Sequence, residues 1–238
     1  VVTKNLIIIN ILMFIGTFLA ETQGINLTQI LAMHYPGSPQ FRPWQLLSHI
    51  FMHGGIMHLV FNMFALWMFG AKIEQVVGAK RFLQLYFFSA IGAFLVHFGV
   101  MFIEAKYIIS HTDSAALQQI ITEGRDVIMN SQNYINDNLA KLNIIYNGSS
   151  MVGASGAIFG ITAAFAVYWP NTELYLMFIP FPIRAKKMII GAAVISLILG
   201  LFDLIPFLTN IAHLAHLGGI LFGFLLVKYW NKTNRKTL

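Results

Sequence analysis

The sequence predicts an all-α membrane protein, a bundle of six transmembrane helices, and three observations support this fold class. Hydrophobic residues make up 57% of the 238 residues and charged residues only 10%, with a mean hydropathy of +0.70. A soluble domain carries about 25% charged residues, so this composition excludes an ordinary soluble enzyme. Apolar stretches of about 20 residues, long enough to cross the hydrocarbon as a helix, recur along the chain.

Six stretches meet this length requirement: residues 5–20, 56–77, 82–103, 152–169, 187–205 and 211–230. The first is the weakest, because Lys4 followed by an apolar run to Ala20 is also typical of a signal peptide. Phe18 argues against that alternative, since cleavage after Ala20 needs a small residue at this position. We therefore expect a retained first helix.

The distribution of positive charge predicts the topology. In a six-span arrangement, 11 of the 15 Lys and Arg residues fall on one side of the membrane, and the other side holds Arg42, Lys106, Arg125 and Lys141. Positively charged loops stay in the cytoplasm, so both termini are expected there, including a basic tail over residues 231–238. This distribution also explains the net charge of +6 without nucleic acid, which is not expected as a partner.

Residues 1–230 are expected to form a single membrane domain with two long exterior connections. Residues 21–55 join the first two spans and contain a partly apolar run, so they are expected to lie in the membrane interface. Residues 104–150 are polar and form an exterior insertion between the third and fourth spans. Amphipathic spacing over residues 113–142 predicts one or two short helices within it.

Ser155 is the candidate nucleophile. It stands in the run Gly153-Ala154-Ser155-Gly156 at the start of the fourth span. The flanking glycines allow a tight bend that exposes the hydroxyl, and a helix amino terminus offers unpaired N–H groups and a positive dipole end to an oxyanion. A simple N-cap serine is the alternative, and it is common at helix starts.

His216 is the candidate base, because a free serine hydroxyl attacks weakly at neutral pH. The spacing of His216, Gly219 and Gly223 places them on one helical face, and the fourth span carries its own stripe of Gly156 and Gly160. Small-residue stripes let helices approach closely in lipid. If these two faces meet, the Ser155 hydroxyl and the His216 imidazole come within hydrogen-bond reach.

The sequence favours a dyad of serine and histidine over a triad. The nearest acid to His216, Asp203, is expected at the far end of a short loop, where it is poorly placed to orient the imidazole. Phe159 follows Ser155 by one helical turn and is expected to pack against the imidazole instead.

His58 and Asn62 are candidate donors to an oxyanion. They lie four residues apart on one face of the second span, and an imidazole N–H and an amide NH₂ both suit that role, together with the Ser155 backbone N–H. The alternative is an interhelical hydrogen bond that serves only packing. Glu74, between Gly70 and Gly78 near the cytoplasmic edge, is expected to tie helix ends together.

Several histidines raise the alternative of a metal or haem site, namely His49, His53, His58, His213 and His216. No carboxylate accompanies them in an H-E-x-x-H pattern, so a zinc hydrolase is poorly supported. Cysteine is absent, which excludes thiolate nucleophiles and cysteine-ligated metals. We therefore expect no metal and no cofactor. His97, in the middle of the third span, is expected to be a packed residue.

Taken together, these features resemble the rhomboid family of intramembrane serine proteases. The resemblance covers residues 44–223 apart from the 104–150 insertion. Its motifs occur in the family's order: His53, His58-x-x-x-Asn62, Gly70-x-x-x-Glu74-x-x-x-Gly78, Gly153-Ala154-Ser155-Gly156, and Ala215-His216-Leu217-Gly218-Gly219 with Gly223.

The resemblance implies that Ser155 is the nucleophile and that His216 is the general base and later the acid. It makes His58 and Asn62 the oxyanion donors, with supporting roles for Gly153, Gly156, Phe159, Gly219, Gly223, Glu74 and His53. Residues 207–212 match the family's flexible cap over the site. The implied partners are transmembrane protein substrates and the lipid bilayer, with the chain as a multi-pass protein of the bacterial inner membrane. No particular oligomeric state is predicted.

Two positions depart from the family pattern. Trp44-Gln45 stands where the family often has Trp-Arg, so anchoring of the exterior loop is expected to differ. Phe159 replaces a frequent tyrosine and keeps the ring without the hydroxyl. Two competing functions remain: a catalytically silent relative that binds transmembrane helices, and a transporter that uses buried histidines.

Overall fold

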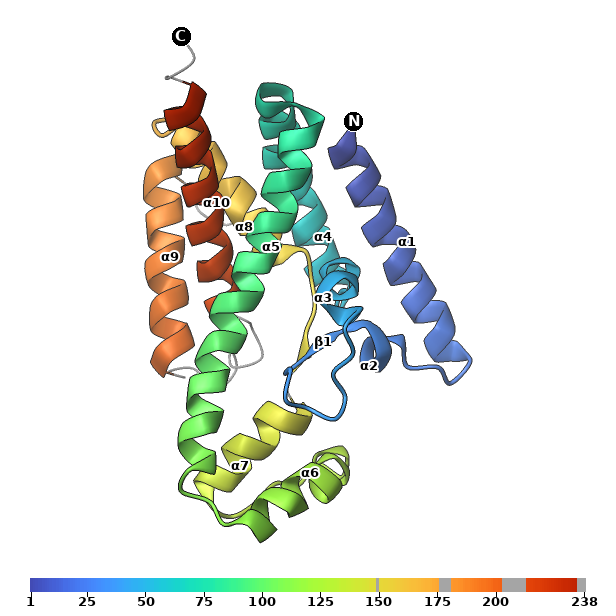
Figure 1. Ribbon diagram of the computed structural model, residues 1–238. Helices are drawn as coiled ribbons and strands as arrows, with labels where there is room; N and C mark the ends of the chain where they lie inside the picture. Colours follow the sequence, from blue (N-terminus) through green and yellow to red (C-terminus); the bar gives the residue numbers. More distant parts are fainter. Residues whose placement is uncertain (149, 176–180, 203–212, 235–238) are drawn as a thin grey trace. The chain divides into compact units, whose positions relative to one another are not determined.

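A computed structural model describes residues 1–148, 150–175, 181–202 and 213–234 of the chain. These residues are largely helical, as predicted (Figure 1). In chain order the helices are α1 (Val2–Thr22), α2 (Leu27–Leu31), α3 (Gln45–Ser48), η1 (His49–Phe51), α4 (Ile56–Ala65), η2 (Leu66–Gly70), α5 (Ala71–Ile109), α6 (Ser114–Met129), α7 (Asp137–Asn143), η3 (Ile144–Gly148), α8 (Ser155–Tyr168), α9 (Ala185–Phe202) and α10 (His213–Asn234).

Two short antiparallel strand pairs accompany these helices. Strand β1 (Met33–His34) pairs with β2 (Ser150–Met151), and β3 (Glu173–Leu174) pairs with β4 (Ile183–Arg184). The first pair joins the connection that follows α1 to the segment that precedes α8, although these lie far apart in the sequence.

The chain divides into two units. The first contains Val1–Leu12, His53–His97 and Gly153–Leu238, and the second contains Met13–Met52 and Phe98–Val152. Every predicted catalytic, oxyanion and supporting residue belongs to the first unit. The second unit holds the two predicted exterior connections except for residues 53–55, which belong to the first. The prediction of a single domain over residues 1–230 stays a prediction.

The helices agree with the predicted spans in position and differ at their ends. Among the described residues, Val2–Thr22 and Ile56–Ile109 are long and apolar enough to cross a membrane, and α8 is a shorter apolar helix. The stretch Ile56–Ile109 is not one straight helix, because Gly78 has φ +79° and ψ 163° and separates the second predicted span from the third. Such a φ suits glycine, which has no Cβ to clash.

The third predicted span needs a correction at its end. The helix continues to Ile109, past the predicted boundary at 103, so the first residues of the predicted insertion are helical. Charged side chains of this extension find partners outside an apolar core: Lys141 forms an ion pair with Glu104, and Lys106 lies 5.5 Å from the Phe102 ring centroid. The polar residues that begin at position 104 therefore show where the helix leaves its apolar surroundings, and they do not mark the end of the helix.

The predicted short helices of the insertion are confirmed as α6 and α7, which pack against each other (Figure 1). Asp113 caps α6 by accepting a hydrogen bond from the Ala116 N–H at 2.8 Å. The half-buried Asn147 of η3 ties this segment to α6 and α7, since its Nδ2 donates to the Ile120 carbonyl at 2.8 Å and to Oδ1 of the buried Asn143 at 2.9 Å. The insertion thus has a specific fold within its own unit.

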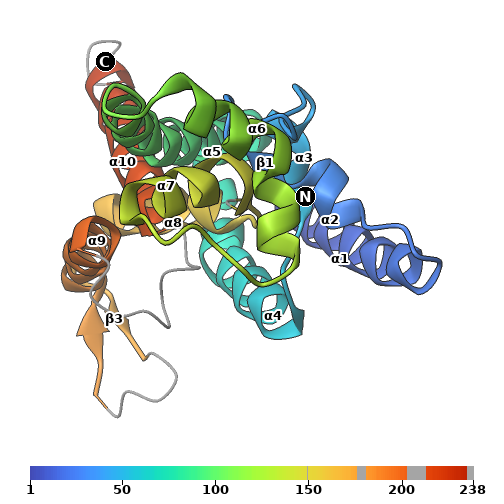
Figure 2. The ribbon, with the colours of Figure 1, turned by 90° about the horizontal axis from the view of Figure 1, so that it is seen from below.

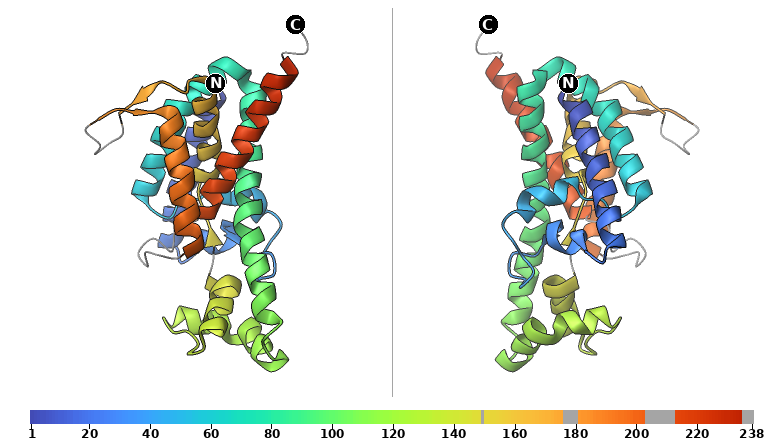
Figure 3. Two further views of the ribbon diagram at one scale, coloured as in Figure 1. Left: turned by 90° about the vertical axis from the view of Figure 1, so that its left-hand side faces the viewer. Right: turned by 90° about the vertical axis from the view of Figure 1, so that its right-hand side faces the viewer.

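Helix α8 forms the core of the first unit. It contacts α4, η2, α9 and α10, and the view in Figure 2 shows it between α9 and α4. Small residues make this burial possible, because most of its buried positions are glycine or alanine: Gly156, Ala157, Gly160, Ala163, Ala164 and Ala166. Helices α9 and α10 lie side by side on one flank (Figure 3). The predicted spans 187–205 and 211–230 correspond to these two helices, and residues 203–212, including the predicted cap, lie outside the described residues.

Large apolar side chains remain exposed on the outer helices. On α1, Leu12 and Phe18 are 61% and 63% exposed, and on α9, Ile190 is 62% exposed. Apolar exposure on this scale would be a liability in water, and it suits helices that face lipid.

Glu74 ties the start of α1 to the first turn of α5, as its position predicted. Its carboxylate accepts hydrogen bonds from the Val2 N–H at 2.6 Å, from the Thr3 N–H at 2.8 Å and from Thr3 Oγ1 at 2.7 Å. The first N–H groups of a helix have no partner within it, so a carboxylate there supplies acceptors and complements the helix dipole.

We expect Glu74→Gln to lower the free energy of unfolding by about 1–2 kcal/mol, because an amide offers one acceptor oxygen and no charge to these donors. Thermal unfolding of the purified chain in detergent measures the effect. Glu21→Gln is the matched control, since the Glu21 side chain is exposed. Equal unfolding temperatures for the two variants would show that the contact contributes nothing.

Candidate active site

Ser155 and His216 approach each other between α8 and α10. Ser155 is the first residue of α8, and His216 lies in the first turn of α10. Ser155 Oγ and His216 Nε2 are 3.0 Å apart, which is hydrogen-bond distance. If Nδ1 carries the ring proton, Nε2 can accept the proton of the hydroxyl.

The predicted glycine stripes bring the two helices this close. A Cβ on Gly219 would collide with the carbonyl of Gly156, and one on Gly223 would lie 2.5 Å from the Gly160 Cα. These contacts are between backbones, so neither helix can accommodate a side chain here without moving. The faces that carry Ser155 and His216 therefore meet as the spacing predicted.

Gly218 takes part in the same packing, through a contact with α5 that the sequence motifs did not predict. A Cβ on Gly218 would lie 2.9 Å from the Ala93 Cα and closer still to the Gly92 carbonyl. The adjacent small residues Gly92 and Ala93 in the third predicted span were the available signal. Close packing of α10 thus involves α5 as well as α8.

Aromatic rings hold the imidazole of His216 in place. The Phe159 ring stacks on it with centroids 4.3 Å apart and an interplanar angle of 26°, as its position one turn after Ser155 predicted. The His213 ring approaches with its edge, at 6.2 Å and 89°. Described residues provide no acid bonded to His216, and Asp203 lies outside the described part of the chain.

His58 and Asn62 lie beside Gly153, the residue that begins the Gly153-Ala154-Ser155-Gly156 run. A Cβ on Gly153 would be 2.8 Å from His58 Nε2 and 3.5 Å from Asn62 Nδ2, and Gly153 itself has φ +115°. Only glycine fits this backbone readily, both for its φ and for the space that His58 occupies. The two predicted donors therefore lie close to the amino terminus of α8.

The side-chain amide of Asn62 is a candidate oxyanion donor, because its NH₂ group makes no hydrogen bond to the described residues. Its side chain is only 7% exposed, and Nδ2 has no hydrogen-bond partner within the described residues. A buried donor left unpaired costs free energy and calls for an explanation. His53 packs against His58, with ring centroids 5.1 Å apart at 66°, and so supports the imidazole of His58 from the side.

Among the residues that the structure describes, the histidines do not gather into a metal site. In the described ranges, no group of three or more His, Cys, Asp or Glu side chains is arranged to hold a metal ion. His49 belongs to the second unit and contacts the Gln45 carbonyl through Nδ1 at 2.6 Å. Burial lowers the pKa of His49 to about 4, so its ring is neutral at physiological pH. Glu74 is occupied with α1 and is not part of the site.

A helical chain whose outer helices expose large apolar side chains is typical of an integral membrane protein, and this one holds a serine hydroxyl at hydrogen-bond distance from a histidine at the start of a buried helix. The sequence matches the Rhomboid domain over residues 40–232, and the chain therefore belongs to the rhomboid family of integral membrane proteins.

Relatives of several kinds agree with this assignment. The chain is 29% identical to Rhomboid protein 1, mitochondrial, of Saccharomyces cerevisiae over 196 residues, which cover 80% of this chain and 43% of that protein. It is 28% identical to RHOMBOID-like protein 5 of Arabidopsis thaliana, over 77% of this chain and 42% of that protein. Rhomboid protease GlpG of Klebsiella pneumoniae is 36% identical over 61 residues, 26% of this chain and 22% of that protein. The chain thus spans less than half the length of these relatives.

Proposed function

We propose that this protein is an intramembrane serine endopeptidase that uses Ser155 and His216 as a catalytic dyad. The observation that carries the proposal is the 3.0 Å separation of Ser155 Oγ and His216 Nε2. Membership of the rhomboid family and likeness to a relative named as a rhomboid protease support it.

The chemistry follows from the positions of these two groups. Ser155 Oγ attacks the carbonyl carbon of a substrate peptide bond while His216 Nε2 takes the hydroxyl proton. The imidazolium then gives that proton to the leaving amine, and the C–N bond breaks to leave an acyl-enzyme on Ser155. Water attacks the ester with His216 again as base, which releases the acid product and restores the serine.

The oxyanion of each tetrahedral intermediate is stabilised by three donors. The Ser155 N–H lies at the start of α8, where N–H groups have no partner within the helix. Asn62 Nδ2 and the His58 imidazole N–H supply the other two from α4. Because the Asn62 donor needs no rearrangement to become available, it suits a preorganised site.

We expect Asn62→Ala to lower kcat for cleavage by about 10²- to 10³-fold, the usual cost of removing one oxyanion donor. KM should change little, because the donor acts on charge that develops only in the transition state. Asn10→Ala is the control: Asn10 is another buried asparagine of the first unit, and it donates to the Leu6 carbonyl. An unchanged kcat in Asn62→Ala would remove this residue from the oxyanion site.

The proposed topology places this chemistry at the exterior side of the membrane. Six spans are assigned to α1, to the stretch Ile56–Ile109 on either side of Gly78, and to α8, α9 and α10. Both termini lie in the cytoplasm, the basic tail of residues 231–238 included, and residues 21–55 lie along the exterior interface. We assign the chain to a bacterial inner membrane, where the substrates are transmembrane segments. Local unwinding of a substrate helix exposes the peptide bond, since lipid-buried backbone otherwise stays hydrogen-bonded.

A serine-reactive fluorophosphonate probe tests the nucleophile. We expect covalent labelling of the wild-type chain and none of Ser155→Ala or His216→Ala, because the probe needs an activated hydroxyl. Ser196→Ala removes another buried serine of the first unit and should label like the wild type. Labelling that persists in Ser155→Ala would refute the assignment. A wild-type chain that never labels would favour the catalytically silent relative or the transporter.

A further inference from the structure

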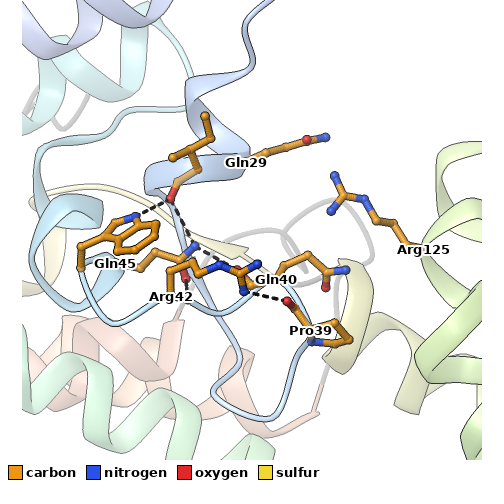
Figure 4. Close-up of a pocket in the computed structure, with 8 residues that line it drawn as sticks. Gln29, Pro39, Gln40, Arg42, Gln45 and Arg125 are labelled. Carbon is orange, nitrogen blue, oxygen red and sulfur yellow. Dashed lines mark hydrogen bonds between the residues drawn. The ribbon is translucent and has the colours of Figure 1, made fainter.

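A cavity of about 330 Å³ in the second unit has no part in the proposed chemistry. Figure 4 shows it between α2, the connection from β1 to α3, and α6 of the insertion. Its lining includes Gln29, Gln40, Arg42, Trp44 and Arg125, and none of the described residues that line it carries a carboxylate. Two guanidinium groups without a nearby acid in the lining favour an anionic ligand.

The two arginines retain donors for such a ligand. Arg42 Nη1 donates to the carbonyls of Pro39 at 2.9 Å and Phe41 at 2.7 Å, which fixes the guanidinium and leaves its other N–H groups without a partner among the described residues. Arg125 forms no hydrogen bond or ion pair within the described ranges. Figure 4 shows its guanidinium turned toward the same space as the amide ends of Gln29 and Gln40.

The wall of the cavity is braced by Gln45, the residue that departs from the family's frequent Trp-Arg pair. Gln45 is fully buried, and its Nε2 donates to the carbonyls of Ile30 at 3.3 Å and Gln40 at 3.1 Å. Its Oε1 accepts from the Arg42 N–H at 3.0 Å. An arginine here has no acceptor and could not make the last contact. The brace holds the wall in shape before any ligand binds, which limits the ordering cost of binding.

An exposed apolar rim adjoins the cavity. Ile30 and Trp44 line the cavity and are 44% and 52% exposed, and Leu46 and Leu47, next in sequence, are 46% and 55% exposed. An aromatic residue with aliphatic neighbours beside a positive charge is typical of a surface at the level of lipid headgroups. The rim can contact the glycerol and upper acyl chains of a lipid whose phosphate lies in the cavity.

We propose that this cavity binds the phosphate of an anionic phospholipid. Arg42 and Arg125 donate to the phosphate oxygens, a geometry that guanidinium groups match well. No carboxylate stands among the described lining residues to bind a choline ammonium, so the site prefers an anionic headgroup to a zwitterionic one. Two parts of the second unit would then bind the same ligand: the insertion through Arg125 and the connection after β1 through Arg42. It does not depend on the role of Ser155.

Native mass spectrometry of the full chain in nonionic detergent tests this proposal. We expect the first dioleoylphosphatidylglycerol to bind about tenfold more tightly than dioleoylphosphatidylcholine, and Arg125→Gln and Arg42→Gln each to remove most of that difference. Arg184→Gln removes a positive charge from the first unit and should bind like the wild type. Arg125→Lys keeps the charge without the paired donors and should bind phosphatidylglycerol with intermediate affinity. This variant shows whether weak binding by Arg125→Gln comes from the lost guanidinium or from misfolding.

Two competition experiments distinguish a lipid phosphate from other anions that could bind in this cavity. Inorganic phosphate and a hexaglutamate peptide should each displace phosphatidylglycerol only at concentrations well above that of the lipid, because neither contacts the apolar rim. Displacement by either at equal concentration would overturn the lipid assignment. Equal phosphatidylglycerol affinity of the wild type and Arg125→Gln would overturn the site itself. Fluorophosphonate labelling of Arg125→Gln should stay at the wild-type level, which keeps this test apart from that of the dyad.

Discussion

Cleavage of a transmembrane substrate in proteoliposomes is expected to fall by at least about 10⁴-fold in Ser155→Ala and in His216→Ala, with no further loss in the double variant. The reason is that the hydroxyl and the imidazole, 3.0 Å apart, act as one unit. Without the imidazole, the hydroxyl has no base to take its proton. Without the hydroxyl, the base has no nucleophile to activate. Each single change therefore removes the whole step.

The comparison between single and double variants is the informative measurement. Independent contributions would multiply, so a double variant far slower than either single variant would contradict a dyad. Ser196→Ala and His111→Ala serve as matched controls, since one removes a buried serine elsewhere and the other an exposed histidine. Circular dichroism and the unfolding temperature of each variant show whether lost cleavage reflects lost chemistry or a lost fold.

The approach of Ser155 to His216 was predictable because each residue lies on a helical face marked by its own glycines. Gly156 and Gly219 indicated where two helices approach, and the structure has their backbones in contact. That contact also determines which side chains meet, because Ser155 and His216 lie at the same end of their respective stripes. Local spacing carried this long-range information, since only small residues allow such an approach in lipid.

Other features depend on positions that no local pattern encodes. The contact of Gly153 with the His58 imidazole follows from the placement of α4 against the start of α8, and neither motif contains that placement. The cavity that Arg42 and Arg125 share requires the insertion to fold toward the connection after β1. Both arginines were predicted only as exterior charges. The end of α5 at Ile109 was not predicted, because the hydropathy of the sequence decreases several residues before the helix ends.

Gly219→Val is expected to lower the unfolding temperature in detergent by about 10 °C or to prevent folding, the largest stability effect we predict. The added side chain would have to occupy the space of the Gly156 carbonyl, which is backbone and cannot turn aside. Overpacking of a core costs about 1–3 kcal/mol even where side chains can adjust, and 3 kcal/mol corresponds to roughly 10 °C in a chain of this size.

A side chain at Gly219 should also affect catalysis through geometry, and the smaller Gly219→Ala substitution tests this in a folded chain. His216 lies one turn before Gly219, so pushing α10 away from α8 lengthens the 3.0 Å contact between Nε2 and Ser155 Oγ. Any folded Gly219→Ala chain should therefore label more slowly with the fluorophosphonate probe than the wild type. Gly191→Ala is the matched control, since a Cβ on Gly191 of α9 meets no atom within 4 Å. Alanine there should raise stability by up to about 1 kcal/mol through helix propensity alone. A Gly219→Ala chain that unfolds and labels like Gly191→Ala would mean that the contact of α8 with α10 does not set the distance between Ser155 Oγ and His216 Nε2.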